Sequence, residues 1–442
     1  NDILGNHYSE LNAQKALIVD VIKQEEISFL KTLDSGLKRL DSMISENKIV
    51  SGADVFELYD TYGFPKDLTS LILQEKKIKF DEVGFIQEME KQKNRSKNSA
   101  NFETGEWIIV IDDANEDFVG YETYQVKTRI SRYRIIENKK KIKYHIVLEE
   151  TPFYAESGGQ VGDNGILDYS GNKIEIIDVK KENNLIYHIT ENLPKDLKEL
   201  CEAKINIDRR QSISRNHSAT HLLHYQLRKN LGDHVIQKGS LVSDNYFRFD
   251  FSHHSPLSND ILDKIEIDIA EMIFQNIPLE EKLNISINDA KNMGALMLFG
   301  EKYGDNVRVI QFGDSLELCG GTHVTSTSEI GLFKIISESS VASGIRRIEV
   351  KTGASAFDLL NNSYQRIKEF ESILKTKDLH QAINKLLIEN KALEDKNNRL
   401  EKESLSNQVY DLISSSEKYG DICFAYDNLN INPKNLNDIS FV

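Results

Sequence analysis

Two short patterns place residues that can bind a metal ion at close spacing. His217 and His221 stand four residues apart in the segment RNHSATHLLH, so on a helix they share one face and both imidazoles can reach one ion. Cys319 and His323 are four apart in LELCGGTH, where two glycines allow a sharp turn that brings the side chains together. Each pair alone has an ordinary alternative: a surface or core histidine pair, or a buried cysteine beside a surface histidine.

Together the two pairs offer three neutral imidazoles and one thiolate, the ligand set that suits Zn²⁺ in a reducing cytosol. The chain has only 3 cysteines, so a disulfide framework is not expected. We therefore predict one zinc site. Four protein ligands are usual for structural zinc, whereas catalytic zinc keeps a position for water or substrate, and the ligand count leaves both roles open.

Other polar residues stand next to these patterns. Thr220 lies inside the HSATH turn, and Gln237 lies in HVIQKGSLV. A threonine in a helix and a Gln-Lys-Gly-Ser turn are usually only structural, which is the alternative to a ligand-binding role. Arg346 and Arg347, in SGIRRIE, can bind the phosphates of RNA or form an ion pair with Glu349.

Two further segments have a composition suited to ligands. Residues 151–165 surround Glu156 and Gln160 with glycines and serines, which suits a loop whose backbone approaches a ligand closely. This loop lacks the Lys-Ser/Thr ending of a P-loop, so we expect no nucleotide triphosphate there. Residues 127–143 are strongly basic, which favours either a contact with an RNA backbone or an ordinary solvated face.

Hydrophobic patterning predicts a multidomain α+β protein that would hold these residues. We expect five parts: a helical region (1–102), a small β-barrel (103–198), an α+β core with the zinc site (199–354), a helical hairpin or coiled coil (355–415) and the start of another domain (416–442). In the fourth part, Leu386, Leu393 and Leu400 stand seven residues apart, so association through this segment is one expectation.

Length and charge narrow the function classes. The 442 residues carry 55 Lys and Arg against 70 Asp and Glu, a net charge of −15, which argues against indiscriminate coating of nucleic acid or an anionic membrane. No apolar run approaches the length of a bilayer span, and the N-terminus lacks a secretory pattern. We expect a cytoplasmic protein without a membrane partner. Because the chain begins with Asn, we expect it to be part of a longer protein.

Six segments taken in order resemble the editing domain of the alanyl-tRNA synthetase family: RNHSATHLLH, HVIQKGSLV, FRFDFSH, LFGEKYGD, LELCGGTH and SGIRRIE. PFYAESGGQVGD and LYDTYGFP, further upstream, resemble the same enzyme. The resemblance covers nearly the whole chain. The HxxxH and CxxxH patterns are also shared with free-standing editing proteins and, more loosely, with the threonyl-tRNA synthetase editing domain.

The resemblance implies roles for particular residues. It assigns the zinc site to His217, His221, Cys319 and His323. It assigns the editing pocket to Thr220 and Gln237. It also implies that Asp60, in DTYGFP, helps to recognise the G·U pair in the acceptor stem of the alanine tRNA.

The resemblance further implies that the class II aminoacylation core precedes residue 1. We find neither the arginine-glutamate motif nor the glycine-rich arginine motif that would bind ATP, so we expect ATP and Mg²⁺ to serve only a core that is absent here, and no aminoacylation from this chain. The expected enzyme is an editing deacylase that hydrolyses tRNA(Ala) mischarged with serine or glycine. An alanine pocket rejects such side chains by only ~1–3 kcal/mol, which makes a second sieve necessary.

In this hypothesis Zn²⁺ orients the aminoacyl end or activates water, Thr220 binds the serine hydroxyl and Gln237 positions water or the terminal ribose. One alternative is a non-catalytic tRNA-binding module with structural zinc, and another is a threonyl-type or free-standing deacylase. A zinc hydrolase of small molecules is disfavoured because no HExxH base accompanies the histidines.

Overall fold

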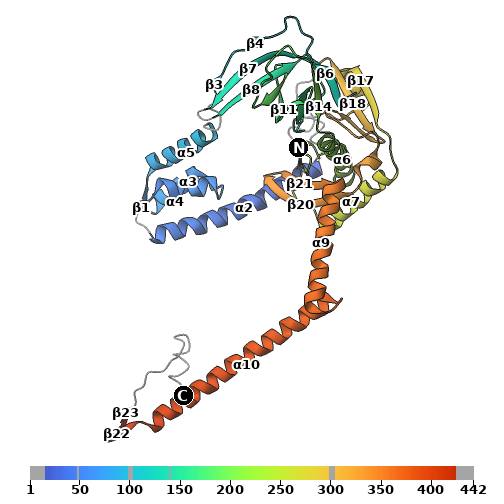
Figure 1. Ribbon diagram of the computed structural model, residues 1–442. Coiled ribbons are helices and arrows are strands. Elements are labelled where there is room, and N and C mark those ends of the chain that lie inside the picture. The colour runs from blue at the N-terminus through green and yellow to red at the C-terminus, as the bar shows by residue number, and fades with distance from the viewer. Residues whose placement is uncertain (1–14, 47–48, 98–102, 139–140, 298–303, 425–442) are drawn as a thin grey trace. The chain divides into compact units, whose positions relative to one another are not determined.

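The computed structural model describes residues 15–46, 49–97, 103–138, 141–297 and 304–424 (Figure 1). The chain divides into two units, with the boundary between Phe357 and Asp358. Among the helices in the described ranges, none combines the length and the apolar character that crossing a bilayer requires.

The first described segment is helical, as predicted. Its elements are α2 (Lys15–Glu46), β1 (Ile49–Val50), α3 (Gly52–Asp60), α4 (Lys66–Glu75), β2 (Lys79–Phe80) and α5 (Glu82–Lys97). Ser51 caps α3, since its hydroxyl accepts from the backbone of Asp54 and the Asp54 carboxylate accepts from the backbone of Ser51, a reciprocal capping box. Pro65 precedes α4 as its N-cap. The buried side chains of Leu40, Val55, Leu58, Phe64 and Phe85 belong to the core of this region.

The second segment consists of short strands. They are β3 (Glu103–Thr104), β4 (Ile108–Ile109), β5 (Asp117–Phe118), β6 (Gln125–Thr128), β7 (Ile130–Asn138), β8 (Lys141–Leu148), β9 (Glu150–Thr151), β10 (Gly165–Tyr169), β11 (Asn172–Ile176), β12 (Asp178–Glu182), β13 (Leu185–Thr190) and β14 (Cys201–Ile205). Neighbouring strands pair antiparallel in two sheets, apart from a small parallel pair of β5 and β9.

The predicted β-barrel is wrong, because the described strands do not close into a ring. One sheet has the order β11-β10-β14-β6, and the other has the order β12-β13-β8-β7-β3 with β4 also on β7. A common core joins the sheets, with Ile146 and Leu148 from β8 against Leu167 from β10 and Ile176 from β11. A barrel and two packed sheets need the same alternation of inward apolar and outward polar residues, so the sequence pattern did not distinguish them.

The third segment mixes helices and strands. They are α6 (Ile207–Leu231), β15 (Gln237–Val242), β16 (Phe247–Ser252), α7 (Asn259–Phe274), β17 (Glu280–Ser286), α8 (Ile287–Asn292), β18 (Asn306–Phe312), β19 (Ser315–Leu318), the 3₁₀ helix η1 (Thr327–Ile330), β20 (Phe333–Ala342) and β21 (Ile345–Thr352). One antiparallel sheet has the order β15-β16-β21-β20, and a second has the order β17-β18-β19.

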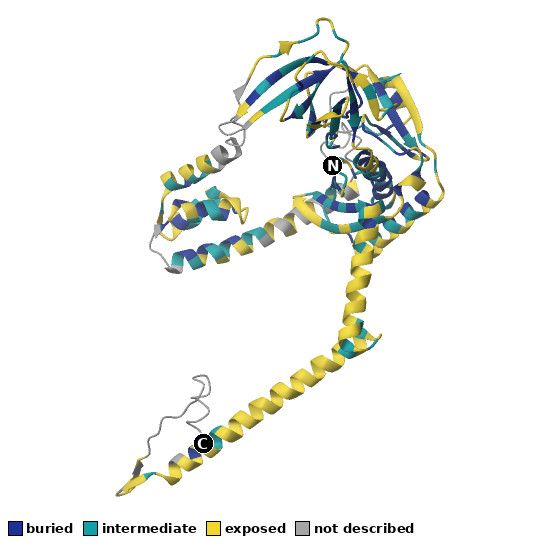
Figure 2. Ribbon diagram, viewed as in Figure 1, coloured by how far each residue is buried: buried dark blue, intermediate teal, exposed yellow. Residues whose placement is uncertain are grey.

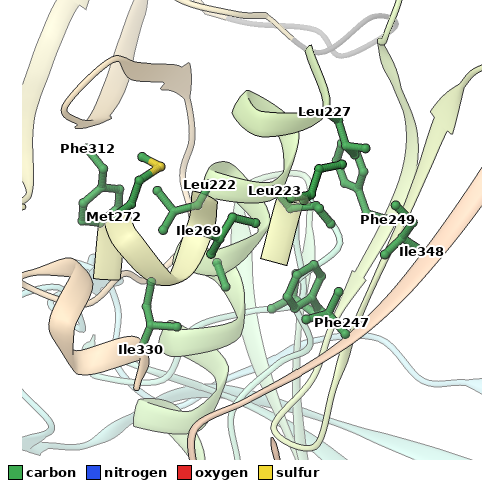
Figure 3. Packing of buried hydrophobic residues seen from close by; sticks show 14 of the residues in the cluster. Leu222, Leu223, Leu227, Phe247, Phe249, Ile269, Met272, Phe312, Ile330 and Ile348 are labelled. Carbon is green, nitrogen blue, oxygen red and sulfur yellow. The ribbon is translucent and has the colours of Figure 1, made fainter. Parts of the chain in front are cut away.

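The apolar core of this segment lies between α6, α7 and the four-stranded sheet. Phe247, Phe249 and Phe251 alternate along β16 and are all fully buried, as their period-2 spacing predicts. In Figure 3, Leu222 and Leu223 of α6 point toward side chains of α7 and β16 in one packed cluster. This packing fixes one side of α6 and thereby orients the polar residues on its other side.

The C-terminal unit contains the end of α9 (Gly353–Leu374), then α10 (Leu379–Ser414), β22 (Glu417–Tyr419) and β23 (Ile422–Phe424). Figure 2 shows α10 coloured as exposed along nearly its whole length. The leucines spaced by seven residues are exposed by 50% at Leu386, 64% at Leu393 and 52% at Leu400. Whether they form a coiled coil stays a prediction.

Candidate metal centre

Helix α6 buries an unusual number of polar side chains. Among its buried residues are Asn216, His217, Ser218, Thr220, His221, His224 and Gln226. Burying polar groups is costly unless each of them finds a partner, so this face of the helix needs a specific set of partners. His217 and His221 stack one turn apart, with ring centroids 5.4 Å apart and planes 7° from parallel.

The other two predicted ligands come from the turn after β19. Cys319 follows the strand directly, and His323 comes after Gly320, Gly321 and Thr322. A Cβ on Gly321 would lie 2.0 Å from the His217 ring, so only glycine lets the turn approach α6 this closely. Arg308 fixes the turn by donating to the carbonyl oxygens of Cys319 at 3.1 Å and Gly321 at 2.6 Å.

A residue from the β-sheet region also holds this turn. The Tyr121 hydroxyl donates to the carbonyl oxygen of Gly320 at 2.5 Å. The guanidinium of Arg308 lies over the Tyr121 ring, 4.3 Å from its centroid, which is a cation–π contact. The turn that carries Cys319 is therefore held by two side chains, Arg308 and Tyr121, that also contact each other.

The structure brings the four predicted ligands together. Their ligand atoms all lie within 4.8 Å of one another. The Cys319 sulfur lies 3.3 Å from Nε2 of His217 and 3.3 Å from Nε2 of His323. Nε2 of His221 is buried and has no hydrogen-bond partner among the described residues.

All three imidazoles of the cluster are oriented in the same way: Nε2 faces the cluster while Nδ1 contacts an oxygen behind it. The outer pairs are His217 with Gln160 Oε1 at 2.7 Å, His221 with Glu317 Oε2 at 2.7 Å, and His323 with Ser218 Oγ at 3.3 Å. Metal-binding histidines almost always use their second nitrogen in this manner. The donor set, the orientation of the rings and the unpartnered His221 Nε2 therefore fit Zn²⁺.

The electrostatics of the cluster favour a thiolate. Burial raises the pKa of the Cys319 thiol, but the imidazoles of His217, His323 and His221 outweigh burial and lower the pKa well below its usual value. Burial lowers the pKa of His323 to about 3. A thiolate and a neutral imidazole are the forms that bind metal.

Glu317 makes the surroundings of His221 different from those of His323. Burial lowers the pKa of His221, but the Glu317 carboxylate and Cys319 outweigh burial and raise it to about 10. Burial likewise raises the pKa of Glu317, but His224 and His221 reverse the effect and hold it below its usual range. The buried Glu317 carboxylate therefore stabilises a positive charge at His221.

Three members of the cluster, His217, His221 and Cys319, line a cleft with a volume of about 280 Å³. Thr220 and Gln237 both line it, together with Tyr154, Ser240 and Arg308. The Thr220 hydroxyl donates to the carbonyl oxygen of Asn216 at 2.8 Å, which leaves its oxygen able to accept a hydrogen bond from a ligand.

The remaining predicted site residues lie elsewhere, because none of Asp60, Arg346 and Arg347 is among the described residues that line this cleft. Asp60 ends α3 and is exposed. Arg346 pairs with Glu338 at 2.5 Å and Arg347 with Asp250 at 2.7 Å, rather than with Glu349 as considered above. Contact of these three residues with RNA stays a prediction.

Sequence reasoning missed the residues behind the ligands. Gln160 was noted only as part of a glycine-rich loop, yet its side chain accepts from Thr322 N at 2.9 Å as well as contacting His217. Glu317 was not singled out at all. Its position two residues before Cys319 was the available indication, because alternate residues of an extended segment share a face.

Comparison with known proteins adds two family matches. The model described as "tRNA synthetases class II (A)" matches residues 1–211. The model described as "Threonyl and Alanyl tRNA synthetase second additional domain" matches residues 307–349. The second match contains Cys319 and His323, while Gln160 lies within the first.

Curated relatives named alanine–tRNA ligase match over most of the chain. The relative from Bacteroides fragilis is 50% identical over 398 residues, which are 89% of this chain and 46% of that protein. The relative from Cytophaga hutchinsonii is 46% identical over 95% of this chain and 49% of its own length. The relative from Flavobacterium psychrophilum is 44% identical over 99% of this chain and 51% of its own. The chain therefore spans about half the length of these relatives.

These matches correct one expectation. We expected the class II aminoacylation core to lie wholly before residue 1, so that the chain would edit without any aminoacylation. The class II synthetase model instead matches residues 1–211, which comprise the helical segment and the β-strand segment. That expectation is wrong. It depended on not finding two short arginine motifs, whereas the family model matches the sequence over 211 residues.

Proposed function

The chain belongs to the alanine–tRNA ligase family, and from this premise we propose that it serves in attaching alanine to tRNA(Ala) and that its metal centre hydrolyses wrongly attached amino acids. The bonds to be cleaved are the esters of Ser-tRNA(Ala) and Gly-tRNA(Ala). The observation that supports this proposal most is the convergence of three imidazoles and one thiolate, of which His217, His221 and Cys319 line a cleft.

The physical requirement is discrimination between small side chains. Serine differs from alanine by one hydroxyl, and an apolar pocket rejects such a difference by only about 1–3 kcal/mol. A second site that binds the hydroxyl adds selectivity that an alanine pocket cannot supply. The oxygen of Thr220 is placed for this role, since its own hydrogen is donated to the Asn216 carbonyl and a serine hydroxyl can donate to it.

Zinc held by His217, His221, Cys319 and His323 would supply Lewis acidity and a fixed position for the ester. Side chains of the cleft would position the other reacting groups. Gln237 lines the cleft and donates from Nε2 to Ser240 Oγ at 3.3 Å, which leaves its Oε1 to position water or the terminal ribose. The side chain of Tyr154 covers another part of the wall.

Recognition of tRNA would use separate surfaces. Asp60 is proposed to recognise the acceptor stem, and Arg346 and Arg347 to contact the phosphate backbone. Both arginines are already paired with carboxylates, so RNA phosphate would have to compete with Glu338 and Asp250 for them.

Deacylation assays test the proposal. Purified chain is mixed with Ser-, Gly- and Ala-tRNA(Ala), and the rates are compared for the wild type, Cys319→Ala and Cys201→Ala. Cys201 is the matched control, because it is a buried cysteine in the β-sheet region. We expect hydrolysis of the Ser and Gly esters only, with a loss of about 100-fold or more in Cys319→Ala, the size expected when a group that stabilises the transition state is removed. Equal rates for the two variants would remove the cluster from the reaction.

A further inference from the structure

Behind the cluster, one buried carboxylate contacts two histidines at once. Glu317 Oε2 lies 2.7 Å from Nδ1 of His221, and Glu317 Oε1 lies 2.8 Å from Nδ1 of His224. His221 and His224 are three residues apart on α6 and therefore lie on the same side of the helix. The Glu317 side chain is 6% exposed, so solvent contributes little to holding it.

The two contacts fix the hydrogen positions. An ionised carboxylate can only accept hydrogen bonds, so both Nδ1 atoms must donate. A neutral His221 then carries its lone pair on Nε2, the atom that lies among the ligand atoms of the cluster. The contact with Glu317 therefore selects the tautomer of His221 that can bind a metal ion.

His224 itself is not a ligand, since it is absent from the cluster. Its ring lies 5.1 Å from the ring of Phe249, and its Nε2 is buried without a hydrogen-bond partner among the described residues. An unpaired buried nitrogen is destabilising, so an apolar residue would suit this place better if packing were the only need. The donation from Nδ1 to Glu317 is what a histidine adds here.

Glu317 is held on a rigid strand. Glu317 of β19 pairs with Ile310 of β18. The residues on either side of Glu317 form backbone hydrogen bonds with Leu296: Leu296 N donates to Leu316 O at 2.9 Å, and Leu318 N donates to Leu296 O at 3.0 Å. The predicted ligand Cys319 lies two residues after Glu317. The strand thus carries the carboxylate that orients one ligand, and the turn directly after it carries another ligand.

We propose that Glu317 is a positioning residue for the metal centre, and that His224 anchors its carboxylate so that it orients His221 for metal binding. The proposal deepens the proposed function and rests on its metal site. Glu317 also lines the cleft, but the role assigned here to Glu317 and His224 is to orient His221 and not to contact the substrate. Their effect is on how tightly the metal is bound.

The test measures zinc affinity by competition with a chromophoric chelator for the wild type, Glu317→Gln and His224→Phe. The amide of Glu317→Gln presents an N–H to one of the two histidines, so that ring must accept at Nδ1 and carry its hydrogen on Nε2, or flip, or lose its partner. We expect the zinc Kd to rise about 10–100-fold, the usual cost of losing a partner behind a ligand. In His224→Phe, which keeps a ring against Phe249, we expect a smaller rise.

Glu338→Gln is the matched control, because Glu338 is also a buried carboxylate, with a side chain 7% exposed, but its partner is Arg346. We expect this variant to keep the wild-type Kd. The Co²⁺-substituted proteins give a second readout, since a displaced His221 alters the ligand-field absorption bands whereas a merely destabilised fold with an intact site does not. If Glu317→Gln does not fold, the Kd of His224→Phe decides the question.

The outcomes separate this proposal from the proposed function. A weakened zinc Kd in these variants supports the positioning role, even if the wild type hydrolyses no Ser-tRNA and the proposed function fails. A wild-type Kd and cobalt spectrum in both Glu317→Gln and His224→Phe would overturn the positioning role, whatever the hydrolysis assay shows.

Discussion

Helices α6 and α10 depart from ordinary amphipathic patterning in opposite directions. α6, with 25 residues, buries polar side chains, among them His217, His221 and His224. α10, with 36 residues, leaves apolar side chains in solvent, with Leu393 exposed by 64%. A typical surface helix buries its apolar stripe and exposes its polar face.

The difference shows what each helix needs in order to be stable. The polar groups of α6 find partners within the fold, such as Glu317 and Gln160, so the helix and the strands around it form a preorganised site. The leucines of α10 have no such partners among the described residues, which suits a surface that another chain covers. We therefore expect chemistry at the buried polar face of α6 and association at the exposed apolar stripe of α10.

The largest predicted contrast is in stability. Leu223→Ala removes a fully buried side chain of α6 and should lower the free energy of unfolding by about 2–5 kcal/mol. Leu393→Ala on α10 should change it by less than about 0.5 kcal/mol, since its side chain is mostly exposed. Urea unfolding at low protein concentration compares the two. Equal destabilisation would mean that α10 is packed within the single chain.

The second contrast concerns association through α10. Replacing Leu386, Leu393 and Leu400 with glutamate removes the apolar stripe, so we expect a self-associating wild type to become monomeric. Light scattering at several concentrations measures the mass. Lys391→Glu is the control, as a charge change at an exposed position of the same helix. A wild type that is monomeric at all concentrations would contradict this use of the stripe.

The smallest effect is expected within the cleft. Thr220→Val keeps the side-chain shape and loses the hydroxyl, so hydrolysis of Ser-tRNA(Ala) should fall by about tenfold, the value of one hydrogen bond. Hydrolysis of Gly-tRNA(Ala) should hardly change. Thr69→Val is a matched control, because Thr69 is also buried on a helix and donates to a carbonyl oxygen four residues back. An equal fall for both esters would argue against binding of the serine hydroxyl by Thr220.

Local patterns predicted much of this molecule. Four-residue spacings in His217–His221 and Cys319–His323 identified the cluster that the structure brings together, and alternation predicted the buried face of β16. These features depend on residues close together in the chain. The helical opening segment was predicted for the same reason.

Features that depend on distant residues were not predicted. Gln160 contacts a histidine 57 residues away and Glu317 one that is 96 residues away, and no local pattern encodes such contacts. The open sheets were mistaken for a barrel because both use the same alternation. The match of the class II synthetase model to residues 1–211 was not predicted, because the expectation depended on two ATP-binding motifs and not on LYDTYGFP and PFYAESGGQVGD, which lie within this range.

The central claim is that the polar face of α6 and the turn after β19 hold one metal ion. The most direct test is the zinc content per chain, measured by elemental analysis after incubation with Zn²⁺ and removal of the excess. The structure predicts one tightly bound zinc per chain in the wild type and in Cys201→Ala, and almost none in Cys319→Ala. A zinc-free wild type, or a Cys319→Ala variant that retains its full zinc, would contradict the account.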